Sequence, residues 1–212
     1  MILCNFQDSF CKWQLTPSNA TLKWKRTTAN QLVEQQKPGP IADYLDHKDG
    51  FFVYAGLPTG NGVENSVAKM KSPEFDAREH PLECFNFWFA FGPEGSGETL
   101  KISVEHDDTD PDVIWSLDQT KFNAAEWTQG RVEVTPMEAT ETNTYRIVIE
   151  TSKGENENSY VVIDQFEFLQ SGIDCKIKPE AAKPQITTTI APTTPTTPAP
   201  TEPPGRKFHQ CH

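Results

Sequence analysis

The sequence predicts an all-β protein, an antiparallel β-sandwich followed by a disordered Thr/Pro-rich tail. Three observations carry this prediction: short segments alternate between apolar and polar residues, turn residues separate them, and a stretch without aromatic residues lies near the end of the chain. Alternation with a period of two places the apolar side chains on one face of a strand. No segment long enough for a typical helix repeats apolar residues with the helical period. Short strands separated by turns indicate two antiparallel sheets packed face to face.

Five segments show strand character, in chain order 50–56, 84–91, 99–105, 131–135 and 145–150. The 84–91 segment carries phenylalanine at every second position from Phe85 to Phe91. Four such rings on one face of one strand mark the centre of a core. The 99–105 segment alternates strictly, with Leu100, Ile102 and Val104 on one face.

The composition changes near the end of the chain. Residues 184–204 contain eight Thr and seven Pro, with Glu202 as the only charge. Such a stretch cannot bury enough apolar surface to offset the entropy of ordering it. We therefore predict a β-sandwich domain over 1–178 and a disordered Thr/Pro-rich stalk or linker over 179–212 that ends near Cys211. An O-glycosylated stalk and an unmodified flexible linker both fit this composition.

Acidic residues outnumber basic ones. The chain has 30 Asp and Glu against 19 Lys and Arg, a net charge of −11 and an isoelectric point near 4.9. It therefore has no electrostatic reason to bind nucleic acid, and anionic membrane surfaces repel it. No apolar run is long enough to cross a bilayer. We expect no nucleic-acid partner and no transmembrane segment in this chain.

Five cysteines, Cys4, Cys11, Cys84, Cys175 and Cys211, point to disulfide bonds. The first four lie in the β domain and allow three pairings, among which sequence alone does not choose. The short separation of Cys4 and Cys11 suits a local loop, and Cys84 and Cys175 would then tie the core strand to the end of the domain. The alternatives are buried free thiols, or a zinc site that the missing Cys-x-x-Cys pairs disfavour. Cys211 remains for an intermolecular link or for a bridge to sequence outside this chain.

Asn19-Ala20-Thr21 is a sequon that predicts N-glycosylation at Asn19. Together with the cysteines and the stalk, it indicates an extracellular chain, either secreted or the ectodomain of a membrane protein. The first residues lack the basic start and apolar stretch of a signal peptide, which taken alone indicates a cytosolic protein. We expect that the leader is not part of this chain.

Seven motifs occur in a characteristic order over about residues 3–176. They are Cys4-Asn-Phe-Gln-Asp-Ser-Phe-Cys11-Lys-Trp13, Trp24-Lys-Arg26, Gly39-Pro40 with Asp46-His47 and 50–54, Lys71-Ser-Pro73, 84–88, Ile114-Trp-Ser116 with Trp127, and 161–166 with Cys175. Together they resemble the MAM domain, an extracellular module named for meprin, the A5 neuropilin antigen and the receptor tyrosine phosphatase mu. The chain departs from the family at Gln7, where Glu is frequent, and at Gln165, where a second Asp is frequent.

The resemblance implies a jelly-roll-like sandwich of two antiparallel sheets. It implies the disulfide bonds Cys4–Cys11 and Cys84–Cys175, in agreement with the loop argument above. It also implies a non-catalytic role in the adhesion or assembly of extracellular and membrane proteins, often through homophilic contact.

Asp164 is a candidate ligand of a metal ion. It shares the parity of four apolar residues, Tyr160, Val162, Phe166 and Phe168. In a regular strand its carboxylate would point into an apolar face, where a charge needs a partner. One hypothesis, suggested by some family members, is that Asp164 and Asp46, with groups near Gln7 and Asp8, hold a Ca²⁺ ion. The alternative is a structural aspartate bonded to backbone amides or to residues 24–26.

A second acidic cluster, Asp108, Asp110 and Asp112, is similar to the start of an EF-hand loop. Val113 stands where that loop requires Gly, and Gln119 where it requires Glu. We interpret the cluster as a solvated turn between strands.

The sequence contains no Gly-x-Ser-x-Gly, no His-Glu-x-x-His and no P-loop. We therefore expect no catalysis and no cofactor apart from the Ca²⁺ considered above. Three hypotheses remain: a protein-binding adhesion module that self-associates, a carbohydrate-binding jelly roll, and an accessory domain of a larger secreted enzyme or receptor. The expected partners are extracellular or cell-surface proteins. Four tryptophans are expected mostly in the core, at positions 13, 24, 115 and 127.

Overall fold

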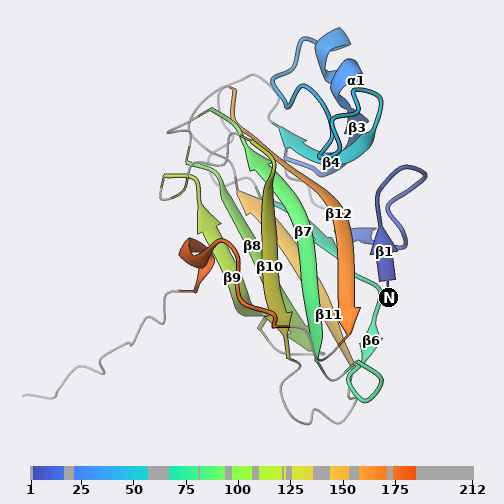
Figure 1. Ribbon diagram of the computed structural model, residues 1–212, viewed down its shortest axis with the longest axis vertical. Helices are drawn as coiled ribbons and strands as arrows, with labels where there is room; N and C mark the ends of the chain where they lie inside the picture. Colours follow the sequence, from blue (N-terminus) through green and yellow to red (C-terminus); the bar gives the residue numbers. More distant parts are fainter. Residues whose placement is uncertain are drawn as a thin grey trace, which may run out of the picture.

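The computed structural model describes residues 2–16, 22–56, 67–80, 82–93, 97–106, 110–120, 122, 126–135, 144–152, 158–170 and 174–184. These residues form two six-stranded antiparallel sheets that pack face to face (Figure 1). The predicted all-β sandwich is therefore confirmed. Each of the five segments predicted as strands overlaps a strand of the structure.

The first sheet contains β1 (Ile2–Cys4), β3 (Lys25–Thr28), β4 (Phe51–Gly56), β7 (Glu83–Phe91), β10 (Thr128–Val134) and β12 (Tyr160–Gln170). Its strand order is β10-β7-β12-β4-β3, and β1 pairs with the second half of β12. The second sheet contains β2 (Gln14–Leu15), β5 (Val67–Lys71), β6 (Phe75–Asp76), β8 (Thr99–His106), β9 (Asp112–Asp118) and β11 (Thr144–Ser152). Its order is β2-β5-β11-β8-β9, and β6 pairs with β11. The last two strands of the chain, β11 and β12, thus lie in different sheets.

The main core lies between the sheets and is built by the alternation visible in the sequence. The four phenylalanines of β7 are fully buried there, at positions 85, 87, 89 and 91. Phe87 and Phe89 pack edge to face on Trp115 of β9, with ring centres 5.2 and 5.4 Å apart. Opposite Phe87, β10 carries Gly130, where a side chain would collide with the ring. Burial of this much aromatic surface is the main source of stability in such a sandwich.

A bulge interrupts β12, because its register against β7 shifts directly after Asp164. Before the bulge, Asp164 shares its face with Tyr160 and Val162, as predicted. After the bulge, Phe166 and Phe168 join the main core, whereas Tyr160 and Val162 belong to a separate cluster. The strand is therefore not regular, and only two of the four residues of equal parity, Tyr160 and Val162, share the face of Asp164. The extra residue of a bulge reverses the alternation of a strand. Odd-numbered residues of β12 therefore face the main core before the bulge, and even-numbered residues face it after the bulge.

The separate cluster lies on the outer side of the first sheet and contains Ala29, Leu32, Phe52, Tyr54, Ala90, Tyr160 and Val162. Helix α1 (Ala29–Glu34) supplies two of these residues and lies beside β3 and β4 (Figure 1). The helix begins at Thr28, whose hydroxyl accepts a hydrogen bond from the Gln31 amide at 3.2 Å. The Gln31 side chain in turn accepts from the Thr28 amide at 3.3 Å, which completes a capping box. With six residues, α1 is too short to show helical periodicity in the sequence.

The packed chain continues past the predicted boundary at residue 178. The backbone of Lys178 pairs with that of Arg131 through two hydrogen bonds of 3.0 and 2.9 Å. Trp115 Nε1 also donates to the Lys178 carbonyl at 2.8 Å. The short turn η1 (Glu180–Ala182) places Ala182, which is fully buried, against the core. The described chain past residue 178 therefore packs against the sandwich through Ala182, and 185–212 with Cys211 lie outside the described residues.

Two disulfide bonds close the fold, Cys4–Cys11 and Cys84–Cys175, with Cα separations of 5.8 and 5.6 Å. This is the pairing that the family resemblance implies. Asn19 lies outside the described residues, so its glycosylation stays a prediction. In the described part of the chain, no helix has the length and apolar character needed to cross a membrane.

Candidate binding surface

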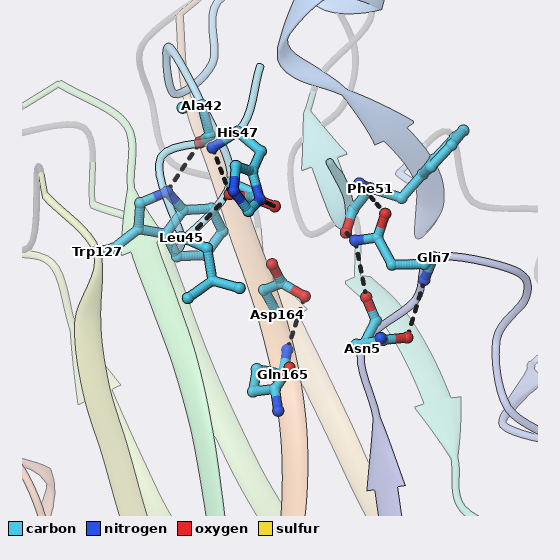
Figure 2. Close-up of polar contacts among 10 residues, drawn as sticks. Asn5, Gln7, Ala42, Leu45, His47, Phe51, Trp127, Asp164 and Gln165 are labelled. Carbon is cyan, nitrogen blue, oxygen red and sulfur yellow. Dashed lines mark hydrogen bonds and ion pairs between the residues drawn. The ribbon is translucent and has the colours of Figure 1, made fainter. Parts of the chain in front are cut away.

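The chain after α1 crosses the outer side of the first sheet, and residues 39–47, here called the 39–47 loop, are held there by two aromatic contacts. Trp127 Nε1 donates a hydrogen bond to the Ala42 carbonyl at 2.9 Å (Figure 2). The ring of Tyr44 stacks on that of Trp88, with ring centres 5.3 Å apart and planes inclined by 25°. Trp88 belongs to β7 and points away from the main core, because alternation gives the inner face to its phenylalanine neighbours.

Asp43 holds the 39–47 loop from the inside. Its side chain is buried, and Oδ1 accepts hydrogen bonds from the amides of Leu45 at 2.9 Å and His47 at 2.8 Å. The other carboxylate oxygen lies 3.6 Å from His47 Nδ1 and against Gly50, where any side chain would collide with it. An aspartate that accepts from amides two and four residues ahead fixes a tight turn. Glycine at position 50 leaves the space that this carboxylate occupies.

Asp164 connects β12 to the 39–47 loop. The residue is 1% exposed and lies opposite Trp88 in the register of β7 and β12. Its carboxylate accepts a hydrogen bond from the Gln165 amide at 2.7 Å (Figure 2). The pKa of Asp164 is raised to about 8, mainly by burial and in smaller part by the charge of Asp43, while hydrogen bonds from the amides of Gln165 and Tyr44 oppose the rise. Gln165 has a φ of 51°, a left-handed conformation that the bulge requires.

Asp46, the second predicted ligand, lies at the exposed tip of the turn. Its amide donates to the Asp43 carbonyl at 3.1 Å, and its φ is 66°. The acid whose charge acts on Asp164 is Asp43, not Asp46. The sequence pattern points to Asp46 and not to Asp43. The only signal for it is an Asp ahead of a turn sequence, which is common in loops without a function.

The groups near Gln7 have other partners. The Gln7 side-chain amide accepts from the Phe51 amide at 3.3 Å and donates to the Phe51 carbonyl at 3.2 Å (Figure 2). Arg26 donates to the carbonyls of Phe6 and Gln7, each at 2.6 Å. The Arg26 guanidinium also lies 3.6 Å from the centre of the Phe51 ring. A protein cation therefore already lies against two carbonyl oxygens of this segment.

Within the part of the chain that the structure describes, the hypothesised Ca²⁺ site has few carboxylate donors. Among the described residues, no group of three or more His, Cys, Asp or Glu side chains is placed to hold a metal ion. Ca²⁺ requires six to eight oxygen ligands, and hydrogen bonds already engage the oxygens around Gln7 and Asp164. Asp164 makes the backbone-amide contacts of the structural alternative. Binding of Ca²⁺ by Asp46 and Asp164 stays a prediction that a titration can test.

The remaining sequence candidates lie apart from this surface. Trp13, Trp24 and Trp115 are buried, as expected, whereas Trp127 is half-buried beside the 39–47 loop. Asp110 and Asp112 are exposed, and Asp108 lies outside the described residues. The stacking of Tyr44 on Trp88 had no signal in the sequence, because it joins residues 44 positions apart through a loop of irregular structure.

The family model of the MAM domain, meprin/A5/mu, matches residues 4–176. The chain belongs to the MAM family. The match begins at Cys4, ends one residue after Cys175, and so contains both disulfide bonds of the structure.

Two solved adhesin domains support the same kind of sandwich. The K1 adhesin domain of Lys-gingipain from Porphyromonas gingivalis W83 is 15% identical, with a TM-score of 0.56 over 81% of this chain and 98% of that one. The K2 adhesin domain of Lys-gingipain is 12% identical, with a TM-score of 0.52 over 80% and 97%. A carbohydrate-binding module, TmCBM61 in complex with β-1,4-galactotriose, is 16% identical, with a TM-score of 0.49 over 78% and 94%. At these identities the likeness concerns the fold alone.

Proposed function

We propose that this MAM-family chain is a non-catalytic extracellular module that binds other proteins at the cell surface or in the extracellular matrix. The family match over residues 4–176 carries the proposal. MAM domains are interaction modules, and the match spans the sandwich except the first two residues of β1 and the last packed residues. Self-association and adhesion between cells are more specific versions of this binding function.

The extracellular location is supported by the two disulfide bonds. Both join described residues of the β domain, and such bonds form and persist in oxidising compartments. Three of the four buried carboxylates among the described residues bond to backbone amides, which supports a role in binding rather than in chemistry. Asp43 and Asp164 accept from backbone amides, and Glu98 accepts from the Tyr160 amide at 3.0 Å. Groups used in this way stabilise loops instead of facing a substrate.

A tetramer of the domain, applied to a panel of cells, tests this function. We expect binding that saturates and that disappears when trypsin has removed the proteins from the cell surface. Treatment of the cells with glycosidases should leave the binding in place. A reduced and alkylated tetramer is the control, because it has lost both disulfide bonds. Absence of saturable binding to every cell type of the panel would contradict the proposal.

A second candidate function is carbohydrate binding, and the stacked Tyr44 and Trp88 rings favour it. Trp88 is half-buried on the outer side of the first sheet. On the same face, Asn86 accepts a hydrogen bond from Arg131 Nε at 2.8 Å. Aromatic rings with polar neighbours are the usual contacts of sugar rings. In the cell assay, loss of binding after glycosidase but not after trypsin would select this candidate.

Self-association is tested separately by sedimentation. A dimer that persists under reducing conditions and depends on the outer face would make the chain its own partner. The chain could also serve as the accessory domain of a larger secreted enzyme or receptor, and it would then bring the same interaction surface to that protein.

A further inference from the structure

A cavity of about 450 Å³ opens between the 39–47 loop, Trp127 and Tyr160. Its lining combines three aromatic rings with three carboxyl groups, those of Tyr44, Trp127, Tyr160, Asp43, Asp46 and Glu126. Ile41 lies at its mouth with 82% of its surface exposed. Leu45, on the same loop, is 55% exposed. Ring faces and carboxylates in one cavity are the surroundings that an organic cation prefers.

The three carboxyl groups of the cavity have different structural roles. Asp43 is bonded to the amides of Leu45 and His47 and therefore supports the wall. Asp46 and Glu126 are exposed, and no ion pair or side-chain hydrogen bond to another described residue engages either carboxylate. Two negative groups are thus available at the mouth of an aromatic cavity.

The walls of the cavity are held in place before any ligand arrives. Trp127 is hydrogen-bonded to Ala42, and its ring packs edge to face on Phe52 at 5.7 Å between centres. Tyr44 stacks on Trp88, and Tyr160 belongs to β12. A ligand would therefore lose little affinity to the ordering of side chains. The net charge of −11 also attracts positively charged partners over longer distances.

We propose that this cavity accepts an arginine or lysine side chain from a loop of a partner protein. The aliphatic stem of that side chain would lie against the rings, and its charged end would meet Asp46 and Glu126. Ile41 and Leu45 would cover apolar surface of the partner beside the basic residue. The inference rests on the proposed protein-binding function. It specifies where a partner protein contacts this chain and which kind of side chain the partner contributes.

Nuclear magnetic resonance with the peptide N-acetyl-Gly-Arg-Gly-amide tests the cavity directly. We expect the indole N–H of Trp127 and the amides of residues 41–46 to shift, with saturation at millimolar peptide. The same peptide with citrulline in place of arginine has the same shape but no charge, and it should shift them at least threefold less. The double variant Asp46→Asn/Glu126→Gln should weaken arginine binding at least threefold. Asparagine tolerates the positive φ of residue 46, so the loop should keep its shape.

A matched control removes two exposed acids elsewhere, through Asp112→Asn/Glu133→Gln on β9 and β10. This control should bind the arginine peptide like the parent. Equal shifts with citrulline, or equal loss in the control variant, would overturn the inference. The inference also fails if Ca²⁺, a sugar or a second copy of the chain shifts these resonances while the arginine peptide does not.

The cell-binding assay separates this inference from the proposed function. If Asp46→Asn/Glu126→Gln tetramers bind cells as well as the control variant, the basic-residue site is wrong and the protein-binding function stands. If the arginine peptide binds as expected but the parent tetramer binds no cell type, the cavity is right and the proposed function is wrong.

Discussion

The two faces of the first sheet are covered in different ways. On the inner face, Phe87 and Phe89 pack on Trp115 and are fully buried among apolar residues. On the outer face, the 39–47 loop covers the sheet, and two carboxyl groups are buried between them, Asp43 of the loop and Asp164 of β12. Buried charge costs stability, whereas apolar burial provides it. The inner face therefore stabilises the sandwich. The outer face lowers the free energy of unfolding, because it buries carboxyl groups that keep the 39–47 loop in its conformation.

The largest expected effect lies on the inner face. Phe87→Ala removes a ring that contacts Phe85, Phe89 and Trp115. Truncation of such a ring leaves a cavity, and the free energy of unfolding should fall by about 3–5 kcal/mol. Urea unfolding of the oxidised protein measures this change. A loss below about 1 kcal/mol, the size of an ordinary substitution, would contradict a single close-packed core.

The buried carboxyl of Asp164 should make stability depend on pH. Its pKa is raised to about 8 in the folded chain, from the usual aspartate value of 3.8. Between these two values the folded chain retains a proton that the unfolded chain has lost, so the free energy of unfolding should fall as the pH rises from about 4 to about 8. One proton changes this free energy by at most about 1.4 kcal/mol per pH unit.

Asp164→Asn removes this titration and keeps an oxygen that can accept from the Gln165 amide. We expect the variant to have a flatter profile of stability against pH, and to be more stable than the parent at pH 8–9. Asp112→Asn, at an exposed position, is the control and should leave the profile of the parent unchanged. Parallel profiles for the parent and Asp164→Asn would show that Asp164 does not carry the effect.

The two indole hydrogen bonds allow the inner and outer faces to be compared directly. Trp127→Phe removes the bond to the Ala42 carbonyl, and Trp115→Phe removes the bond to the Lys178 carbonyl. Loss of one such bond costs about 1 kcal/mol, and more where the abandoned carbonyl is buried. In hydrogen exchange, Trp127→Phe should speed exchange mainly in residues 42–47. Trp115→Phe should speed exchange at residue 178 and in the sheets. The reverse pattern would contradict the assignment of Trp115 to the inner face and Trp127 to the outer face.

Calcium should have little effect on the melting temperature of the protein. The melting temperature should shift by less than the scatter of repeated scans at millimolar Ca²⁺, because Arg26 and Phe51 already engage the groups around Gln7. Binding to the folded state would raise the melting temperature with Ca²⁺ concentration. A rise that disappears in Asp164→Asn would support the ion site predicted from the sequence.

The sequence predicted the inner face well and the outer face poorly. Alternation in residues 84–91 and 99–105 identified the strands and the buried phenylalanines, because a single local period decides which side chains face the core. The bulge after Asp164 carried no such signal. Its left-handed residue is Gln165, not the glycine that usually marks this conformation.

The 39–47 loop shows why the candidate site was only partly predicted. Asp164 was recognised as a buried charge, but Asp46 was chosen as its neighbour in place of Asp43. The choice depends on which of two carboxylates in a short turn points inward. Hydrogen bonds within the turn and the space left by Gly50 decide this, and both arise from the folded geometry.

The exposed apolar residues of the 39–47 loop provide the most direct test of the account. Ile41 and Leu45 are 82% and 55% exposed, so Ile41→Ser/Leu45→Ser should change stability by no more than about 0.5 kcal/mol per residue. We predict that tetramers of this variant nevertheless lose at least tenfold in binding to the cells that the parent binds. Undiminished binding by a variant of unchanged stability would show that the partners of this domain contact another face.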